Sequence, residues 1–242
     1  MIKFENLIYI IIVLFGFIIP FIYALYKNKV EHIIKKEHFL YVYIIYIFAF
    51  LFFAKISYVV FNNPNSIYYI LFTDSIKYKL AFVLSGYSFW GGYIGTMIII
   101  QYFLLLIKEK GIYIFSMSSL LMYSILKIGC LIKGCCSGHG KIPIPLLEII
   151  IIFVLFLLIV FLEKRKYKKD NLTILNILLF SIERFIVGFF RSFSTTNSFY
   201  FNEMSSIIII FICYIYYEHK IKWIGDSYLK VSIEFAKWNY NI

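Results

Sequence analysis

The chain has 242 residues, of which 62% are hydrophobic, 21% aromatic and only 15% charged, and its mean hydropathy is +0.85. A soluble domain of this length could hardly stay in solution with that balance, so the composition excludes a soluble globular protein and predicts an integral membrane protein. The formal net charge is +11. Because the lysines lie in short connections between apolar runs and form no extended basic domain, the expected partner is anionic lipid and not nucleic acid.

Runs of about 20 apolar residues, the length of helix that crosses a bilayer, recur along the chain. Seven can be read, at Leu7–Leu25, Phe39–Val60, Phe89–Ile107, Ile112–Ile132, Pro143–Leu162, Leu172–Phe190 and Tyr200–Tyr217. The predicted fold class is therefore all-α, an integral membrane bundle of seven transmembrane helices over residues 1–217. Residues 218–242 carry aromatic side chains among lysines, which predicts an amphipathic tail on the inner membrane surface.

The orientation follows from counting Lys and Arg in alternate connections, because cytoplasmic loops carry the excess. One side has fifteen: Lys27, Lys29, Lys35, Lys36, Lys108, Lys110, Lys164, Arg165, Lys166, Lys168, Lys169, Lys220, Lys222, Lys230 and Lys237. The other side has six: Lys3, Lys77, Lys79, Lys133, Lys141 and Arg191. This asymmetry places the N-terminus outside and the C-terminus in the cytoplasm.

Six ionisable residues border the predicted spans at one common depth, near their outer ends: Lys55, Lys127, Glu148, Glu183, Arg184 and Arg191. A charge within an apolar run is costly, so it marks a site for an ion, lipid or substrate unless the side chain snorkels to the interface. Snorkelling accounts for Lys55 or Arg191 taken singly. It accounts less well for six residues at one level, next to the glycine-rich stretch Gly86–Gly95.

Helical spacing gives a second constraint. Arg184, Gly188 and Arg191 share one helix face, as do Lys127, Cys130 and Gly134. If both faces point to the centre of the bundle, they form an outward-opening cationic pocket with Glu148 or Glu183 as balancing carboxylate. Guanidinium and ammonium groups at this depth suit the phosphate of an outer-leaflet lipid.

The stretch Lys127–Gly138 holds three cysteines and three glycines. It can be a ligand site, or a glycine-rich helix end that buries small thiols. Cys130, Cys135 and Cys136 have no C-x-x-C spacing, and the nearby imidazole is His139 alone, so no metal site is predicted.

Five segments together resemble bacterial prolipoprotein diacylglyceryl transferase, in a variant with a Gly-Cys-Cys turn. Ser88–Gly95 resembles the motif S-F-H-G-G-x-x-G, and Lys127–Gly138 resembles G-R-I-G-C-F-x-x-G-C-C-x-G without its first glycine. Arg184–Arg191 resembles R-F-x-x-E-F-x-R. Glu148 ends a segment similar to P-x-Q-L-Y-E, and Ala54–Tyr58 is similar to G-A-R-L-x-Y. The matches follow the family's order from the second to the sixth span.

The resemblance implies a plasma-membrane enzyme, expected as a monomer, that moves diacylglyceryl from phosphatidylglycerol to the lipobox cysteine of a prolipoprotein signal peptide. It implies no cofactor and no metal. The residues expected to be catalytic are Arg184, Lys127 and Glu148. Those expected to bind substrate are Trp90, Gly91, Gly92, Cys130, Gly134, Ser88, Lys55, Tyr58 and Arg191.

Four positions depart from the family motifs. Trp90 replaces a histidine, Lys127 an arginine, Cys130 an asparagine and Gly188 a glutamate. Lys127 keeps a charge but loses the guanidinium fork, and Trp90 cannot take up a proton, so a base would have to be Glu148 or Glu183. Two alternatives remain open: a transferase with another acceptor, and a homologue that binds lipid or signal peptide without turnover.

Overall fold

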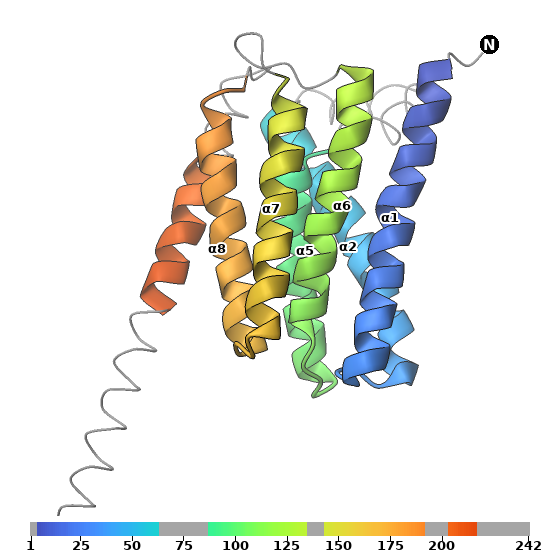
Figure 1. Ribbon diagram of the computed structural model, residues 1–242, viewed down its shortest axis with the longest axis vertical. Coiled ribbons are helices and arrows are strands. Elements are labelled where there is room, and N and C mark those ends of the chain that lie inside the picture. The colour runs from blue at the N-terminus through green and yellow to red at the C-terminus, as the bar shows by residue number, and fades with distance from the viewer. Residues whose placement is uncertain (1–3, 63–86, 135–142, 192–202, 217–242) are drawn as a thin grey trace, which may run out of the picture.

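A computed structural model of the chain describes residues 4–62, 87–134, 143–191 and 203–216. Within these ranges the chain forms helices and no strand, which confirms the all-α prediction. The helices are α1 (Phe4–Glu31), α2 (Lys36–Asn62), α5 (Phe89–Leu106), α6 (Ile112–Lys133), α7 (Ile144–Lys164), α8 (Lys169–Gly188) and a last helix, Glu203–Tyr216. They run up and down alternately, with the last helix beside α8 (Figure 1).

Six of these helices are long and apolar enough to cross a membrane, and they match the first six predicted spans. The seventh differs, because Glu203–Tyr216 is shorter than the roughly 20 residues that span a bilayer. The ends of the predicted span Tyr200–Tyr217 lie outside the described residues. So do the tail 218–242, most of the connection Phe61–Ser88, and the pair Cys135 and Cys136.

Helix α6 is the centre of the bundle, since it packs against α1, α5, α7 and α8. Serines let the neighbouring helices come close, and their hydroxyls are satisfied across the interfaces. The Ser119 hydroxyl lies 2.9 Å from the Tyr46 hydroxyl of α2. The Asn176 amide of α8 donates to Ser116 Oγ at 2.6 Å. Polar pairs of this kind fix the register of helices that the apolar surface alone would leave free to slide.

Helices α2 and α5 meet through the glycines that open α5. A Cβ on Gly95 would overlap the Phe53 ring, and one on Gly91 would overlap the Ser57 side chain. A Cβ on Gly92 would lie 2.9 Å from that of Ala54. The glycine-rich stretch therefore has a packing role: it allows close approach of two membrane helices.

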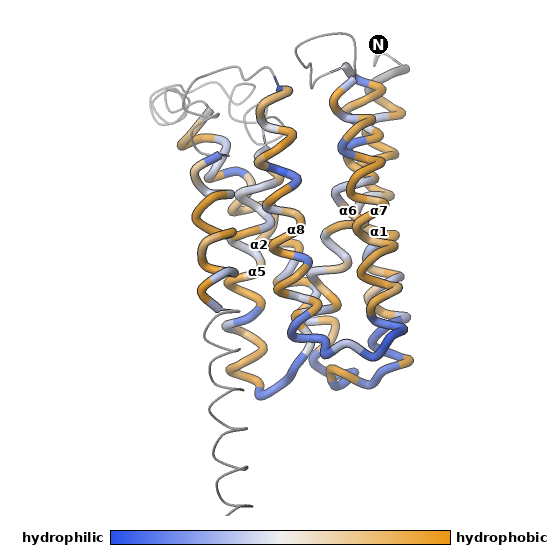
Figure 2. Tube along the Cα trace, turned by 60° about the vertical axis from the view of Figure 1, so that its left-hand side comes forward, coloured by the Kyte–Doolittle hydropathy of each residue, from blue (hydrophilic) through white to orange (hydrophobic). Residues whose placement is uncertain are grey.

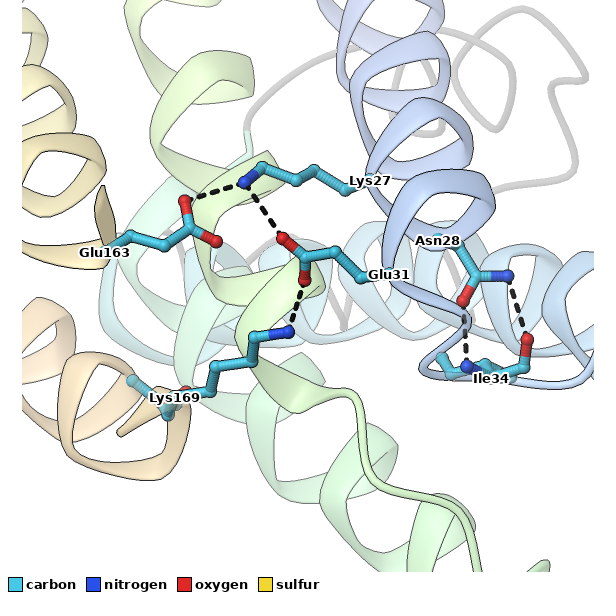
Figure 3. A network of polar contacts seen from close by, with 7 residues as sticks. Lys27, Asn28, Glu31, Ile34, Glu163 and Lys169 are labelled. Carbon is cyan, nitrogen blue, oxygen red and sulfur yellow. Dashed lines mark hydrogen bonds and ion pairs between the residues drawn. The ribbon is translucent and has the colours of Figure 1, made fainter. Parts of the chain in front are cut away.

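The two ends of the bundle differ in polarity. The connections α1–α2, α5–α6 and α7–α8 gather at one end, where hydrophilic residues concentrate, while the helices are mostly hydrophobic (Figure 2). At this end Lys27 Nζ lies 2.6 Å from Glu163 and 3.2 Å from Glu31, and Lys169 pairs with Glu31 (Figure 3). This network joins α1, α7 and α8. It lies at the opposite end of the bundle from the first turns of α5 and α7.

Candidate functional site

A single buried carboxylate lies at the centre of the candidate site. Helix α7 begins at Ile144, with Pro143 as its N-cap and Pro145 in its first turn. Proline is tolerated there because the first backbone N–H groups of a helix have no partner within it. This start places Glu148 about one turn into the helix, with its side chain fully buried against α6 and α8.

Three cations converge on Glu148. Lys127 Nζ of α6 lies 2.6 Å from Oε2, and Arg184 Nη1 of α8 lies 2.9 Å from Oε1. Arg191, just beyond α8, places Nη2 3.0 Å from Oε1 and 3.2 Å from Oε2. Lys127 and Arg184 are each 6% exposed. A buried charge is retained only where it is paired. Here Glu148 pairs with all three cations at once.

Tyr123 completes this cluster, and the sequence analysis did not select it. Its hydroxyl donates to Glu148 Oε1 at 2.7 Å and accepts from Arg184 Nη1 at 2.7 Å. Its ring also lies below the ammonium of Lys127, 5.0 Å from the centroid. The signal was present in the sequence, because Tyr123 precedes Lys127 by four residues and so lies on the same face of α6.

The predicted helix faces are partly realised. Arg184 and Arg191 both reach Glu148, but α8 ends at Gly188, so Arg191 lies beyond the helix face that it was predicted to share. On α6 the buried member of the predicted face is Lys127. Cys130 is half-buried, and Gly134 is the exposed C-cap of the helix, in the left-handed conformation at φ 64°.

The residues that open α5 form an apolar wall beside the cluster. Ser88 caps the helix by accepting from Gly91 N, and Phe89 lies with its ring centroid 4.4 Å from that of Tyr123. Trp90 is 1% exposed, packs edge-on against Phe180, and donates from Nε1 to Ser205 Oγ at 2.6 Å. Trp90 is therefore a buried packing residue that links α5 to the last helix.

The site residues predicted on α2, Lys55 and Tyr58, lie apart from the Glu148 cluster. Lys55 stands over two aromatic rings, with its Nζ 4.9 Å from the Tyr87 centroid and 5.7 Å from that of Tyr58. These are cation–π contacts with tyrosines at the end of α2 and just before α5. They place Lys55 at the edge of the bundle, where snorkelling also accounts for it.

Two further carboxylates are buried near the cluster. Glu183 is 3% exposed and Glu203, the first residue of the last helix, is 4% exposed. In the described parts of the chain, neither carboxylate has a hydrogen-bond partner. Glu203 lies against Gly188, where its Oε1 occupies the position that a Cβ would take. The sequence predicts Glu183 as a candidate balancing carboxylate, but its patterns do not single out Glu203.

The arrangement can hold an anion at one end of a membrane bundle. In the ion-paired group three positive charges meet one negative charge, an excess of two. Arg184 and Arg191 present planar donors suited to phosphate or carboxylate oxygens, and Lys127 adds a compact charge. Among the residues described, no group of three or more His, Cys, Asp or Glu side chains is placed to hold a metal.

The comparison with known families agrees with these motifs and with this geometry. The family model for prolipoprotein diacylglyceryl transferase matches residues 2–218. The chain belongs to this family. A comparison with curated proteins found no match. The prolipoprotein diacylglyceryl transferase family comprises transferases of lipoprotein biosynthesis in the bacterial plasma membrane, and six membrane-spanning helices fit a multi-pass member. The family match includes every element that contributes to the Glu148 cluster.

Proposed function

We propose that this protein moves the diacylglyceryl group of phosphatidylglycerol to the thiol of a lipobox cysteine in a prolipoprotein signal peptide. The products are a thioether-linked lipid and glycerol phosphate. The observation that carries the proposal is the buried cluster in which Lys127, Arg184 and Arg191 meet Glu148 at one end of the bundle. A departing phosphate is the group that such a cluster stabilises best.

In this mechanism Arg184 and Lys127 bind the phosphate, and Glu148 and Tyr123 position them. Arg184 offers a guanidinium fork to the lipid phosphate, and Lys127 offers a point charge. Glu148 and Tyr123 hold both cations in place before the lipid arrives, so that little reorganisation is needed as charge develops on the leaving group. We assign Glu148 to this positioning role because both its oxygens already accept hydrogen bonds or ion pairs.

The topology that accompanies this proposal is N-terminus outside and C-terminus in the cytoplasm. It is supported by the excess of Lys and Arg in the connections at the end opposite Glu148. The site then faces the outer leaflet, and Glu203–Tyr216 belongs to a seventh span. We propose a monomer, because all groups of the cluster come from one chain.

The test uses the purified protein in vesicles of phosphatidylglycerol labelled in the glycerol of its diacylglyceryl group, with a lipobox peptide as acceptor. We expect label to move to the peptide in a linkage stable to base, as a thioether is. Arg184→Lys should lower transfer by at least tenfold, since the charge stays and the fork is lost. Arg184→Leu should abolish it. Arg165→Lys is the matched control at the other end of the bundle and should transfer normally.

Three results would contradict the proposal in different ways. Normal transfer by Arg184→Leu would remove the reason for placing the site here. If Arg184→Leu only reduced membrane accumulation and Arg184→Lys transferred lipid normally, Arg184 would merely balance a carboxylate. Retained phosphatidylglycerol without any transfer by the wild type would favour the lipid-binding homologue, for which Trp90 in place of a histidine is the specific observation.

A further inference from the structure

The carboxylate of Glu203 has no place in the chemistry described so far. Its side chain is 4% exposed, and neither oxygen accepts a hydrogen bond from any residue that the structure describes. Burying a polar group without a partner is costly, so such a group in a native protein requires an explanation. An incoming substrate that donates a hydrogen bond or a proton would supply one.

Glu148 cannot serve as that proton acceptor. A carboxylate has about four lone-pair sites, and those of Glu148 face Tyr123, Arg184, Arg191 and Lys127. Taking up a proton there would also leave two buried cations, Lys127 and Arg184, and the half-buried Arg191 facing a neutral group. In contrast, no donor among the described residues occupies the lone pairs of Glu203, so these can accept from a substrate.

The position of Glu203 follows from the glycine at 188. The motif that Arg184–Arg191 resembles has a glutamate there, whereas this chain has Gly188. The Oε1 atom of Glu203 lies where a Cβ on Gly188 would be, so a side chain at position 188 would displace the Glu203 carboxylate from its present position. The glycine at 188 thus leaves room beside α8 for a carboxylate from the next helix.

Glu203 also lies close to the cation cluster. It packs against Gly188 of α8, and Arg184, one turn before Gly188, acts electrostatically on the Glu203 carboxylate. A thiol that attacks a lipid whose phosphate is held by Arg184 therefore comes close to Glu203.

We propose that Glu203 accepts the proton of the acceptor thiol, an inference that rests on the proposed transferase function. The thiol S–H bond breaks and its proton goes to the Glu203 carboxylate. The sulfur electron pair then forms a bond to the glycerol carbon that carries the phosphate. The C–O bond breaks, its electron pair leaves with glycerol phosphate beside Arg184 and Lys127, and the Glu203 proton passes to that phosphate.

Glu183 provides the matched control, because it too is a buried glutamate without a hydrogen-bond partner in the described chain. It differs in its surroundings. Arg184, Lys127 and Arg191 all act on Glu183, so it belongs to the charge balance of the cation cluster. Among the residues that the structure describes, Arg184 is the charged group that acts on Glu203.

The experiment compares Glu203→Gln with Glu183→Gln in the vesicle transfer assay. Glu203→Gln should lower turnover at saturating peptide by about 100-fold, the usual contribution of general base catalysis. Its membrane accumulation and its retention of phosphatidylglycerol should stay within twofold of wild type. Its residual transfer should rise with pH as the peptide thiol, with an ordinary pKa near 8.5, ionises by itself. Glu183→Gln should lose less than tenfold in turnover.

A second variant tests the exchanged position directly. Gly188→Glu combined with Glu203→Ala returns the carboxylate to α8 and should recover at least a tenth of the wild-type turnover, whereas Glu203→Ala alone should not. Normal turnover by Glu203→Gln, or equal losses in Glu203→Gln and Glu183→Gln, would overturn the inference. If the wild type transfers no lipid at all, the proposed function fails, and the role of Glu203 as base fails with it.

Discussion

Replacing Glu148 by glutamine removes the one negative charge shared by three cations while keeping the size of the side chain. Lys127, Arg184 and Arg191 lie 2.6, 2.9 and 3.0 Å from its oxygens, so all three lose their partner at once. Removing one member of a buried ion pair costs about 3–5 kcal/mol, because the remaining charge is left uncompensated. We expect Glu148→Gln to lose at least this much stability.

The assay is thermal unfolding in detergent micelles, with and without phosphatidylglycerol. If the cations bind a lipid phosphate, the anionic headgroup replaces the missing carboxylate. Phosphatidylglycerol should then stabilise Glu148→Gln more than it stabilises the wild type, and a zwitterionic lipid should not. The control is Glu163→Gln, whose carboxylate pairs with Lys27 at the opposite end of the bundle. That variant should show no extra gain from phosphatidylglycerol.

Two results would refute this reasoning. Wild-type stability of Glu148→Gln would show that the three cations are solvated or paired otherwise, and that Glu148 does not organise them. A destabilised variant that responds equally to both lipids would show that the cluster holds the helices together but does not recognise a phosphate.

Three further predictions follow from the packing and the topology. Tyr123→Phe removes the hydroxyl that joins Glu148 to the α8 arginine, so it should cost about 1–3 kcal/mol of stability and slow transfer in the vesicle assay. Gly95→Leu should prevent α2 from packing on α5, and immunoblotting of membranes should show little accumulated protein. With the four native cysteines replaced by serine, Lys133→Cys should react with an impermeant thiol reagent in intact cells, and Lys166→Cys only after permeabilisation; the reverse pattern would overturn the proposed orientation.

The sequence by itself determined where the helices lie along the chain and which family the chain belongs to. Long apolar runs leave a chain in a bilayer no alternative to helices, because every backbone polar group must be satisfied internally. The spacing of Arg184 and Arg191 predicted that both would point to the centre of the bundle. Both reach Glu148, although α8 ends at Gly188 and Arg191 lies just beyond it. The order of the motifs predicted the family, which the match over residues 2–218 confirms.

Only the tertiary structure decided which groups meet. The sequence offers both Glu148 and Glu183 as carboxylates that could balance the cations. The structure pairs Glu148, because Glu183 directly precedes Arg184 and points about 100° away from it around α8. The periodicity of a sequence shows which residues share a face of one helix, but not which face of another helix packs against them. The position of Glu203 against Gly188 depends on two helices packing together, so no local pattern in either one indicates it.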